Sequence, residues 1–353
     1  MIVKTDCSHF KGDIPCKPHK EHKVHCEECN YYQRISQNIL VIKLGAIGDV
    51  IRTTPLLRKI RQENSNVYIY WLSYTPDILS NNWINRILSP TTENIELLKN
   101  IEFDWLINLD KDPIAISLTH SIKAKRKSGF TIDNFGHAKP IGTDAENHKW
   151  LTGLFDDVNK ENKKNYMKEI FEICGYEFNG EEYILDVHEN DSKFDIDKNK
   201  KVIGLNTGCG GKWTSRLWPT EYWIELAKKL LQENYEVILL GGEQEDEKNK
   251  FIQKESGAKY FGHFSLQVFI NLMNNCDLVV TAVTMGMHLA IGLKKKLVLF
   301  NNIFNRNEFY LYGRGEILEP DFDCNCYYTP TCENNCMQYL YPNKVLDSIK
   351  VLI

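Results

Sequence analysis

The sequence predicts a two-domain α/β protein with parallel sheets and a cysteine-rich segment at each end. Short aliphatic runs, typical of strands buried on both faces, alternate with helical stretches. This pattern begins near residue 38 and begins again near residue 202, after a charged stretch at 188–200. Four of the eleven cysteines lie within residues 7–29 and four within residues 324–336. We therefore expect four parts, at 1–34, 35–190, 191–320 and 321–353.

Composition excludes several classes of protein. A length of 353 residues suggests about two domains at roughly 150 residues each. Hydrophobic residues make up 42% and charged residues 25%, which excludes collagen-like, coiled-coil and disordered chains. The net charge of −4 gives no overall basis for binding nucleic acid or an anionic membrane. No apolar run is long enough for a transmembrane segment and the N-terminus lacks a secretory signal, so we expect a cytoplasmic protein.

The first 34 residues are rich in Cys, His and Lys and contain few aliphatics. Such a segment cannot bury a core of its own, which favours stabilisation by a metal. Thiols stay reduced in the cytosol, so clustered cysteines indicate a metal site rather than disulfides. Cys26-x2-Cys29 has the spacing of a metal knuckle. The expected ligands are Cys7, Cys16, Cys26 and Cys29, and the spacing does not fix which nearby histidines take part.

The C-terminal cysteines are spaced closely enough to surround one ion with four thiolates. They are Cys324, Cys326, Cys332 and Cys336. Zinc is the default for tetrahedral sulfur ligation and iron is the competitor. Free thiols in two loops are the alternative interpretation. The two clusters could share one site or hold two ions, and we expect the metal to be structural.

In the first domain, aliphatic and aromatic runs predict strands at 39–42, 67–72 and 105–110. One helix is expected over 50–62, with Pro55 in its opening turns. The polar stretch 131–165 suggests a long loop over a cleft. A helix over 165–174 is expected to end at Gly175.

The second domain repeats this alternation. Strands are predicted at 202–206, 278–280 and 297–300, a strand with its turn at 237–242, and a helix over 222–232. Two domains of this kind are expected to hold a ligand in a cleft at the carboxyl ends of their strands.

Each domain contributes one loop that could carry chemistry. Asp49 follows a strand and a glycine-rich turn, near a helix N-terminus that favours the ionised carboxylate. It is a candidate general base, with a simple helix cap as the alternative. Asp110 follows another strand and is a rival carboxylate at the same cleft. The turn at 206–212 has the glycines, hydroxyl and cation typical of phosphate binding, but no Walker motif.

Four motifs in order resemble the heptosyltransferases of glycosyltransferase family 9, which have the GT-B fold. They are Gly-Ala-Ile-Gly-Asp-Val-Ile-Arg-Thr-Thr-Pro at 45–55, Asn-Thr-Gly at 206–208 with Lys-Trp-Thr-Ser-Arg-Leu-Trp-Pro at 212–219, Gly-Gly-Glu-Gln-Glu at 241–245, and Thr-Met-Gly-Met-His-Leu-Ala at 284–290. Three positions depart from the family pattern. Arg216 replaces a lysine, Val283 an aspartate and Met285 a glycine.

The resemblance implies transfer of a heptose with inversion, from a nucleoside diphosphate donor such as ADP-heptose to an acceptor hydroxyl. Asp49 matches the family's catalytic aspartate, and Asp110 remains a rival base or acceptor ligand. The resemblance implies that the donor is held by Thr207, Gly208, Arg216, Glu245, Thr284, Gly286, Met287 and His288. The Arg216 fork could stabilise the leaving diphosphate, so no catalytic divalent cation is expected.

The end of the chain resembles the branch of this family that glycosylates autotransporter proteins and carries a cysteine-bound iron. The acceptor could therefore be a protein Ser/Thr or a glycan, and a homo-oligomer is possible. In this fold the C-terminal helix is expected to return to the first domain. The alternatives are an epimerase or transferase using another nucleotide sugar, a non-catalytic metal-binding scaffold, and, less favoured, nucleic-acid binding through the basic stretch 17–23.

Overall fold

The computed structural model describes residues 1–188 and 193–353 and divides the chain into two compact units. The first unit comprises residues 1–150 and 169–181, and the second comprises 151–168 and 182–353. Residues 151–168, expected in the first domain, thus group with the second. The expected boundary between residues 190 and 191 lies outside the described residues.

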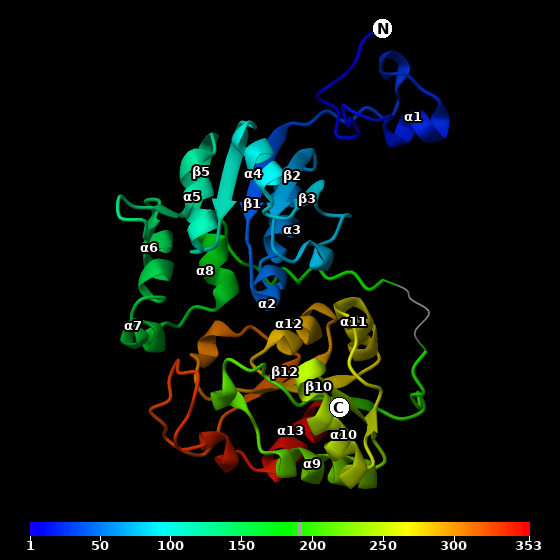
Figure 1. Cartoon of the computed structure of the whole chain (residues 1–353), viewed down its shortest axis with the longest axis vertical. Coiled ribbons are helices and arrows are strands. Elements are labelled where there is room, and N and C mark those ends of the chain that lie inside the picture. The colour runs from blue at the N-terminus through cyan, green and yellow to red at the C-terminus, as the bar shows by residue number, and fades with distance from the viewer. Residues whose placement is uncertain (189–192) are drawn as a thin grey trace. The chain divides into compact units, whose positions relative to one another are not determined.

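A six-stranded sheet forms the centre of the first unit (Figure 1). Its order is β3-β2-β1-β4-β5-β6, parallel except for the antiparallel β5–β6 pair. The strands are β1 (Gln37–Ile42), β2 (Val67–Leu72), β3 (Arg86–Leu88), β4 (Phe103–Asn108), β5 (Ala124–Ile132) and β6 (Ala138–Pro140). In the central register Ile39 lies opposite Ile69 of β2 and Trp105 of β4. The strand predicted at 67–72 is confirmed, the one predicted at 39–42 lies within β1, and the one predicted at 105–110 lies two residues earlier, at 103–108.

The helices of the first unit differ from prediction in two places. After the N-terminal segment they are α2 (Ile47–Ile51), α3 (Pro55–Glu63), α4 (Thr92–Lys99), α5 (Pro113–Ser121), α6 (Asp144–Leu151) and α8 (Tyr166–Ile173), the last two crossing the division between the units. The single helix expected over 50–62 is wrong: the chain turns at 52–54 and Pro55 begins a new helix. The long loop expected over 131–165 is also wrong, since it contains β6, α6 and α7 (Asp156–Glu161).

The N-terminal segment contains little regular structure. It has one short helix, α1 (Lys17–His22), and one 3-10 turn, η1 (Cys26–Glu28). An isolated bridge joins Cys7 to Arg34 near the start of the sheet.

The second unit is built on a fully parallel sheet with the order β12-β11-β10-β7-β8-β9. The strands are β7 (Val202–Asn206), β8 (Glu236–Leu240), β9 (Lys259–Tyr260), β10 (Leu278–Ala282), β11 (Lys296–Phe300) and β12 (Gly315–Leu318). Counted from its own first strand, each sheet has the order 3-2-1-4-5-6, the Rossmann order. The order therefore reverses between β1 and β4 in one unit and between β7 and β10 in the other.

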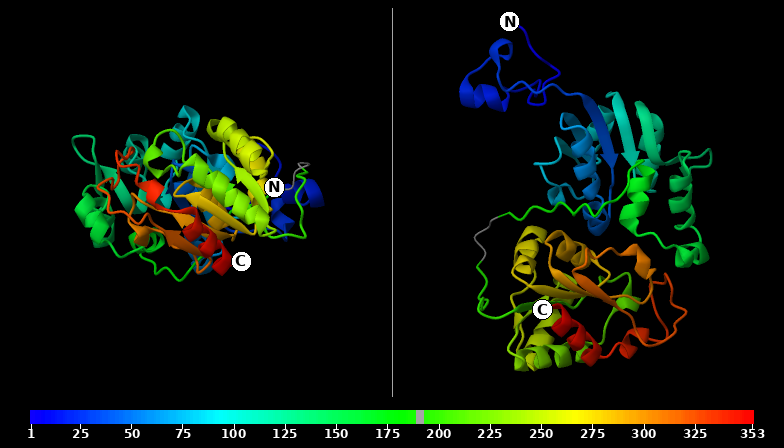
Figure 2. Two further views of the ribbon diagram at one scale, coloured as in Figure 1. Left: turned by 90° about the horizontal axis from the view of Figure 1, so that it is seen from below. Right: turned by 180° about the vertical axis from the view of Figure 1, so that it is seen from behind.

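Helices cover both faces of this second sheet, with α9, α10 and α13 on one side and α11 and α12 on the other (Figures 1 and 2). They are α9 (Thr220–Gln232), α10 (Asp246–Ser256), α11 (Leu266–Asn274), α12 (Met285–Gly292) and α13 (Pro342–Leu352). The C-terminal helix α13 does not return to the first unit as expected. It buries Val345 and Ile349 in the core formed with Trp223 and Phe300 of the second unit. Among the described residues, no helix is long and apolar enough to cross a membrane.

Candidate active site

The candidate site residues cluster where the strand order reverses. At such a point the loops leave neighbouring strands in opposite directions and make room for a ligand at the carboxyl ends. In the second unit the loops that leave this point are residues 206–208 and 283–286. In the first unit they are residues 43–49 and 109–110.

Asn206 ties the ends of β7 and β10 together in the second unit. Its Nδ2 lies 2.8 Å from Thr281 Oγ1 and 3.3 Å from Thr284 Oγ1. The Thr284 hydroxyl accepts the Gly286 N–H at 3.1 Å and so caps α12. A Cβ at Gly286 would lie only 2.7 Å from Asn206 Nδ2. The sequence therefore needs glycine here to bring the start of α12 against β7.

The glycine-rich turn after β7 packs against Glu245, which ends the 3-10 turn η4 (Glu243–Glu245). A Cβ at Gly208 would lie 2.1 Å from the Glu245 carboxyl group, so only glycine fits this approach. One Glu245 oxygen accepts the Gly242 N–H at 2.9 Å. Thr207 is buried, and its hydroxyl donates to Asn249 Oδ1 at 2.6 Å. Thr207, Gly208 and Glu245 are therefore brought together as predicted from the resemblance.

Arg216 connects the glycine-rich turn to the end of β10. Its guanidinium donates to the Val283 carbonyl and, at 3.1 Å, to the Cys209 carbonyl. Burial lowers the pKa of this side chain. Because both contacts are to main-chain oxygens, the replacement of the family's aspartate by Val283 does not remove them. The arrangement places a cation between the two loops that follow β7 and β10.

Met287 and His288 lie inside the second unit, as Thr207, Gly208 and Gly286 do. Both are buried in α12. His288 Nδ1 lies 3.4 Å from the Tyr183 hydroxyl, and the two rings stack at 6.2 Å between centroids. Of the eight predicted donor residues, Glu245 alone lines the pocket described next.

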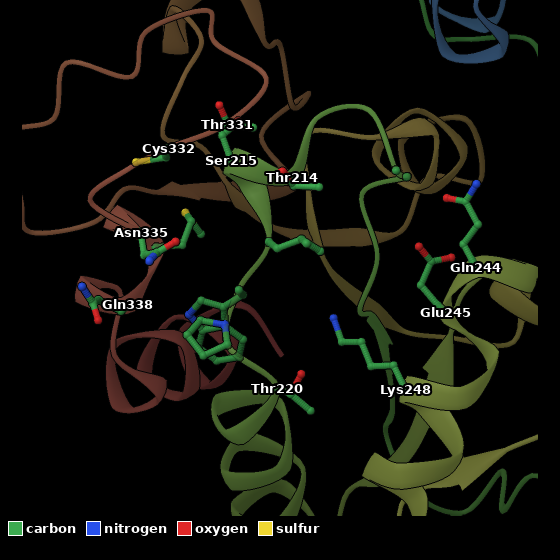
Figure 3. Close-up of a pocket in the computed structure, with 16 residues that line it drawn as sticks. Thr214, Ser215, Thr220, Gln244, Glu245, Lys248, Thr331, Cys332, Asn335 and Gln338 are labelled. Carbon is green, nitrogen blue, oxygen red and sulfur yellow. The ribbon is translucent and has the colours of Figure 1, made fainter.

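A pocket of about 730 Å³ opens beside the glycine-rich turn of the second unit. Figure 3 shows Gln244, Glu245 and Lys248 on one side of it and Cys332 and Asn335 on the other. Sequence analysis missed Lys248, whose Nζ lies 2.7 Å from the Thr207 carbonyl and whose pKa is lowered by burial. The spacing could have revealed it, since Lys248 lies in the first turn of α10, three residues after Glu245, the residue that precedes this helix.

The C-terminal cysteines form a complete four-sulfur group. The Sγ atoms of Cys324, Cys326, Cys332 and Cys336 all lie within 4.8 Å of one another. The Cys324–Cys332 and Cys326–Cys336 sulfur pairs are 3.5 and 3.6 Å apart. A tetrahedral ion with metal–sulfur bonds of about 2.3 Å requires sulfurs about 3.8 Å apart. The group therefore has the composition and spacing to hold one metal ion.

Hydrogen bonds connect this cysteine loop to the segment that carries Arg216. Asn302 Nδ2 lies 2.7 Å from the Ser215 carbonyl and 3.3 Å from Cys336 Sγ. The Ser215 hydroxyl donates to the Thr329 carbonyl at 2.8 Å, and its N–H donates to the Pro330 carbonyl at 3.0 Å. The conformation of the Arg216 segment therefore depends on the fold of the cysteine loop.

Asp49 lies in the first turn of α2 in the first unit. Its Oδ1 is 2.7 Å from Arg52 Nη2, and about a third of its side chain (34%) is exposed. The ion pair orients the carboxylate while leaving part of it accessible to solvent. This geometry is compatible with accepting a proton from a bound hydroxyl.

Both carboxylate oxygens of Asp110 are hydrogen-bonded. One of its oxygens accepts the Leu44 N–H at 3.0 Å and pairs with Lys43 Nζ at 3.3 Å. The other accepts the N–H groups of Lys111 at 2.9 Å and Asp112 at 3.2 Å. Both oxygens are thus used to hold the loops that follow β1 and β4.

A curated relative, lipopolysaccharide heptosyltransferase 2 of Salmonella typhimurium, is 29% identical to this chain over 114 residues. The match covers 30% of this chain and 32% of the relative, so it spans about a third of each.

Solved structures match over most of the chain. The family 9 glycosyl transferase of Veillonella parvula has a TM-score of 0.67 at 16% identity, over 90% of this chain and 97% of its own. E. coli ADP-heptose lps heptosyltransferase II has 0.64 at 18%, over 89% and 98%. The iron-containing dodecameric glycosyltransferase TibC of enterotoxigenic E. coli has 0.55 at 13%, over 90% and 76%. These likenesses support the predicted two-unit α/β fold.

The match to a family's sequence pattern extends beyond local motifs. The pattern of glycosyltransferase family 9 (heptosyltransferase) matches residues 95–302, more than half of the chain. This range includes β4, Asp110 and all the predicted donor residues of the second unit. The chain therefore belongs to glycosyltransferase family 9.

Proposed function

We propose that this protein is an inverting heptosyltransferase that uses ADP-heptose and an acceptor hydroxyl. The observation that carries the proposal is the convergence of Glu245, Arg216 and the capped start of α12 on the β7/β10 switch point. A carboxylate suited to ribose hydroxyls, a guanidinium and helix N–H groups match the parts of a nucleoside diphosphate. The names of the Salmonella and E. coli relatives support a heptose as the transferred sugar.

In the proposed reaction, Asp49 removes the proton from the acceptor hydroxyl. The acceptor oxygen then forms a bond to the anomeric carbon from the face opposite the leaving group. The bond from that carbon to the diphosphate oxygen breaks, and its electron pair leaves with ADP. Arg216 and the start of α12 stabilise the charge that develops on the diphosphate, so the step needs no divalent cation.

We assign Asp110 a positioning role. Its four donors, three of them main-chain N–H groups, already occupy both oxygens. Using it as a base would require breaking these contacts. Its function in this proposal is to hold the Lys43–Asp49 loop so that Asp49 faces the acceptor.

We also propose that the C-terminal cysteine group holds one structural ion, zinc or iron. The four sulfurs fit tetrahedral coordination. The iron-containing neighbour TibC supports iron.

The dodecameric state named for TibC supports testing this chain for a homo-oligomer. Cytoplasmic location and a glycan or protein acceptor remain predictions.

The test is ADP release from ADP-heptose, measured with a glycan acceptor and with a Ser/Thr-containing protein acceptor. Loss of a general base is expected to lower kcat by about 10²- to 10⁴-fold in Asp49→Asn. The donor Kd should stay within about 3-fold, because Asp49 makes no contact with the donor in this mechanism. Asp112→Asn, a neighbouring carboxylate that caps α5, is the matched control and should retain activity.

Two results would contradict the proposal. Undiminished ADP release by Asp49→Asn would exclude this residue as the base. A thermal shift with another nucleotide sugar, without any shift from ADP-heptose, would keep the fold and overturn the donor assignment.

A further inference from the structure

The N-terminal segment, residues 1–35, has almost no core. All of its residues are described, and Pro18 is the only one that is buried. Its regular structure is limited to a six-residue helix, a 3-10 turn and the Cys7–Arg34 bridge. A segment of this size does not offset its loss of chain entropy without a disulfide or a metal. All four of its cysteines are free thiols.

Three separate stretches of this segment bring those cysteines to one small cavity of about 30 Å³. Cys7 lies on the bridge to Arg34, Cys16 precedes the first turn of α1, and Cys26 and Cys29 lie at the two ends of η1. All four line the cavity and are half-buried. The volume exceeds the minimum that holds one water molecule, so a single ion fits. The sulfurs of these four cysteines lie farther apart than those of the C-terminal group, which are all within 4.8 Å of one another.

The contacts of the nearby histidines indicate which of them could bind a metal ion in the cavity. His19 Nδ1 lies 2.9 Å from the Val24 carbonyl. His22 stacks on Tyr31 at 4.4 Å, and His25 meets the His19 ring edge-on. Of the four histidines in this segment, His9 lines the cavity. Four thiols therefore form the first choice of ligand set, with His9 as the one histidine positioned to replace one of them.

We propose that residues 1–35 bind their own metal ion, of the zinc class, through Cys7, Cys16, Cys26 and Cys29. The C-terminal group already supplies four sulfurs, so it needs no ligand from this segment. Binding draws the four sulfurs together, each thiol losing its proton to solvent as its bond to the ion forms. The ion takes the place of a hydrophobic core. The inference stands independently of the proposed transferase activity.

The first test counts zinc and iron together in the full-length protein by plasma mass spectrometry after growth with both metals. Wild type should hold two ions per chain. Cys26→Ser/Cys29→Ser and Cys324→Ser/Cys332→Ser should each hold one, and the single variant Cys209→Ser should hold two. His9→Ala should also hold two. One ion in wild type, or two ions in Cys26→Ser/Cys29→Ser, would overturn the proposal.

A second measurement does not depend on counting. Trypsin can cut after Lys11, Lys20 and Lys23, all of which are exposed. Cleavage at these sites should accelerate at least 10-fold in Cys26→Ser/Cys29→Ser compared with Cys209→Ser, while the second unit stays intact. Equal cleavage rates in these two variants would contradict ordering by metal.

Discussion

The two four-cysteine segments of this chain have the same side-chain chemistry, but only the C-terminal one places two of its cysteines in a hydrophobic core. Cys326 and Cys336 are buried with Ile303, and Trp213 and Phe304 pack against them. The N-terminal cysteines are half-buried in a segment whose one buried residue is a proline. We infer that an ion at the C-terminal group supports the wall of a ligand pocket. An ion in the N-terminal segment would order that segment alone.

The largest expected effect therefore comes from the C-terminal group. Cys326→Ser/Cys336→Ser should abolish its metal binding and release the loop that supports Ser215 and Arg216. Leaving two buried polar groups without the ion should cost at least about 3 kcal/mol. For a unit of this size that corresponds to a fall in Tm of roughly 6 to 12 °C. Calorimetry and donor titration check this, and we expect donor affinity to fall at least 30-fold.

A donor affinity within 2-fold of wild type after loss of the C-terminal ion would contradict this prediction. The matched pair is Cys26→Ser/Cys29→Ser, which also removes two thiols. In that variant the main unfolding transition should move by less than about 2 °C.

A second prediction concerns a substitution in the opposite wall of the pocket, away from both cysteine groups. Gly208→Ala places a Cβ 2.1 Å from the Glu245 carboxyl group, which has to move. Overpacking of this kind costs about 1–3 kcal/mol. We expect a 10-fold loss of ADP affinity by calorimetry with the metal content unchanged. Gly211→Ala, where a Cβ meets only Gln244 at 3.6 Å, is the control and should bind ADP normally. Equal affinities in the two variants would exclude the assigned role of Glu245.

A third and smaller effect is expected from Asn302→Ala. This change removes the hydrogen bond from Nδ2 to the Ser215 carbonyl and the contact to Cys336 Sγ. Loss of such a bond costs about 1 kcal/mol, of which only part should reach the donor site. Donor Kd should rise about 3-fold while the C-terminal ion is retained. Loss of the ion in this variant would mean that Asn302 stabilises the metal site and not the Arg216 segment.

The strands could be predicted from sequence because a strand buried on both faces appears as a run of consecutive apolar residues. The expected range 67–72 is β2 and 202–206 is β7, without a shift. Both are aliphatic or aromatic runs buried between helix layers. Motif resemblance likewise predicted that Gly208 and Glu245 belong to one site. The same method failed over 131–165, whose short helices have no apolar periodicity.

Some parts of the structure could not be predicted because they depend on hydrogen bonds that leave no pattern in the sequence. Glu146 is buried, and its carboxylate accepts the N–H groups of Gly129, Gly142 and Thr143. This bonding fixes the stretch that looked like a loop. Main-chain N–H groups also hold both oxygens of Asp110, which the sequence offered as a rival to Asp49.

The smallest effect on function is predicted for modification of the N-terminal thiols. Chelation should make these thiols reactive, and their modification should leave catalysis unchanged. In EDTA at pH 8, iodoacetamide should modify Cys26 and Cys29 before Cys326 and Cys336, because the latter pair is buried even without an ion. Peptide mass spectrometry follows the order of labelling. Cys276 is an internal control, since burial raises its pKa to about 12 and it should remain unmodified.

At the point where Cys26 and Cys29 are modified and Cys326 is not, ADP release should remain within 2-fold of protein kept in the same EDTA buffer without iodoacetamide. Loss of activity that parallels modification of Cys26 would contradict the contrast between the two segments. It would place the N-terminal segment in contact with a substrate, because its own unfolding leaves the pocket beside Glu245 unchanged.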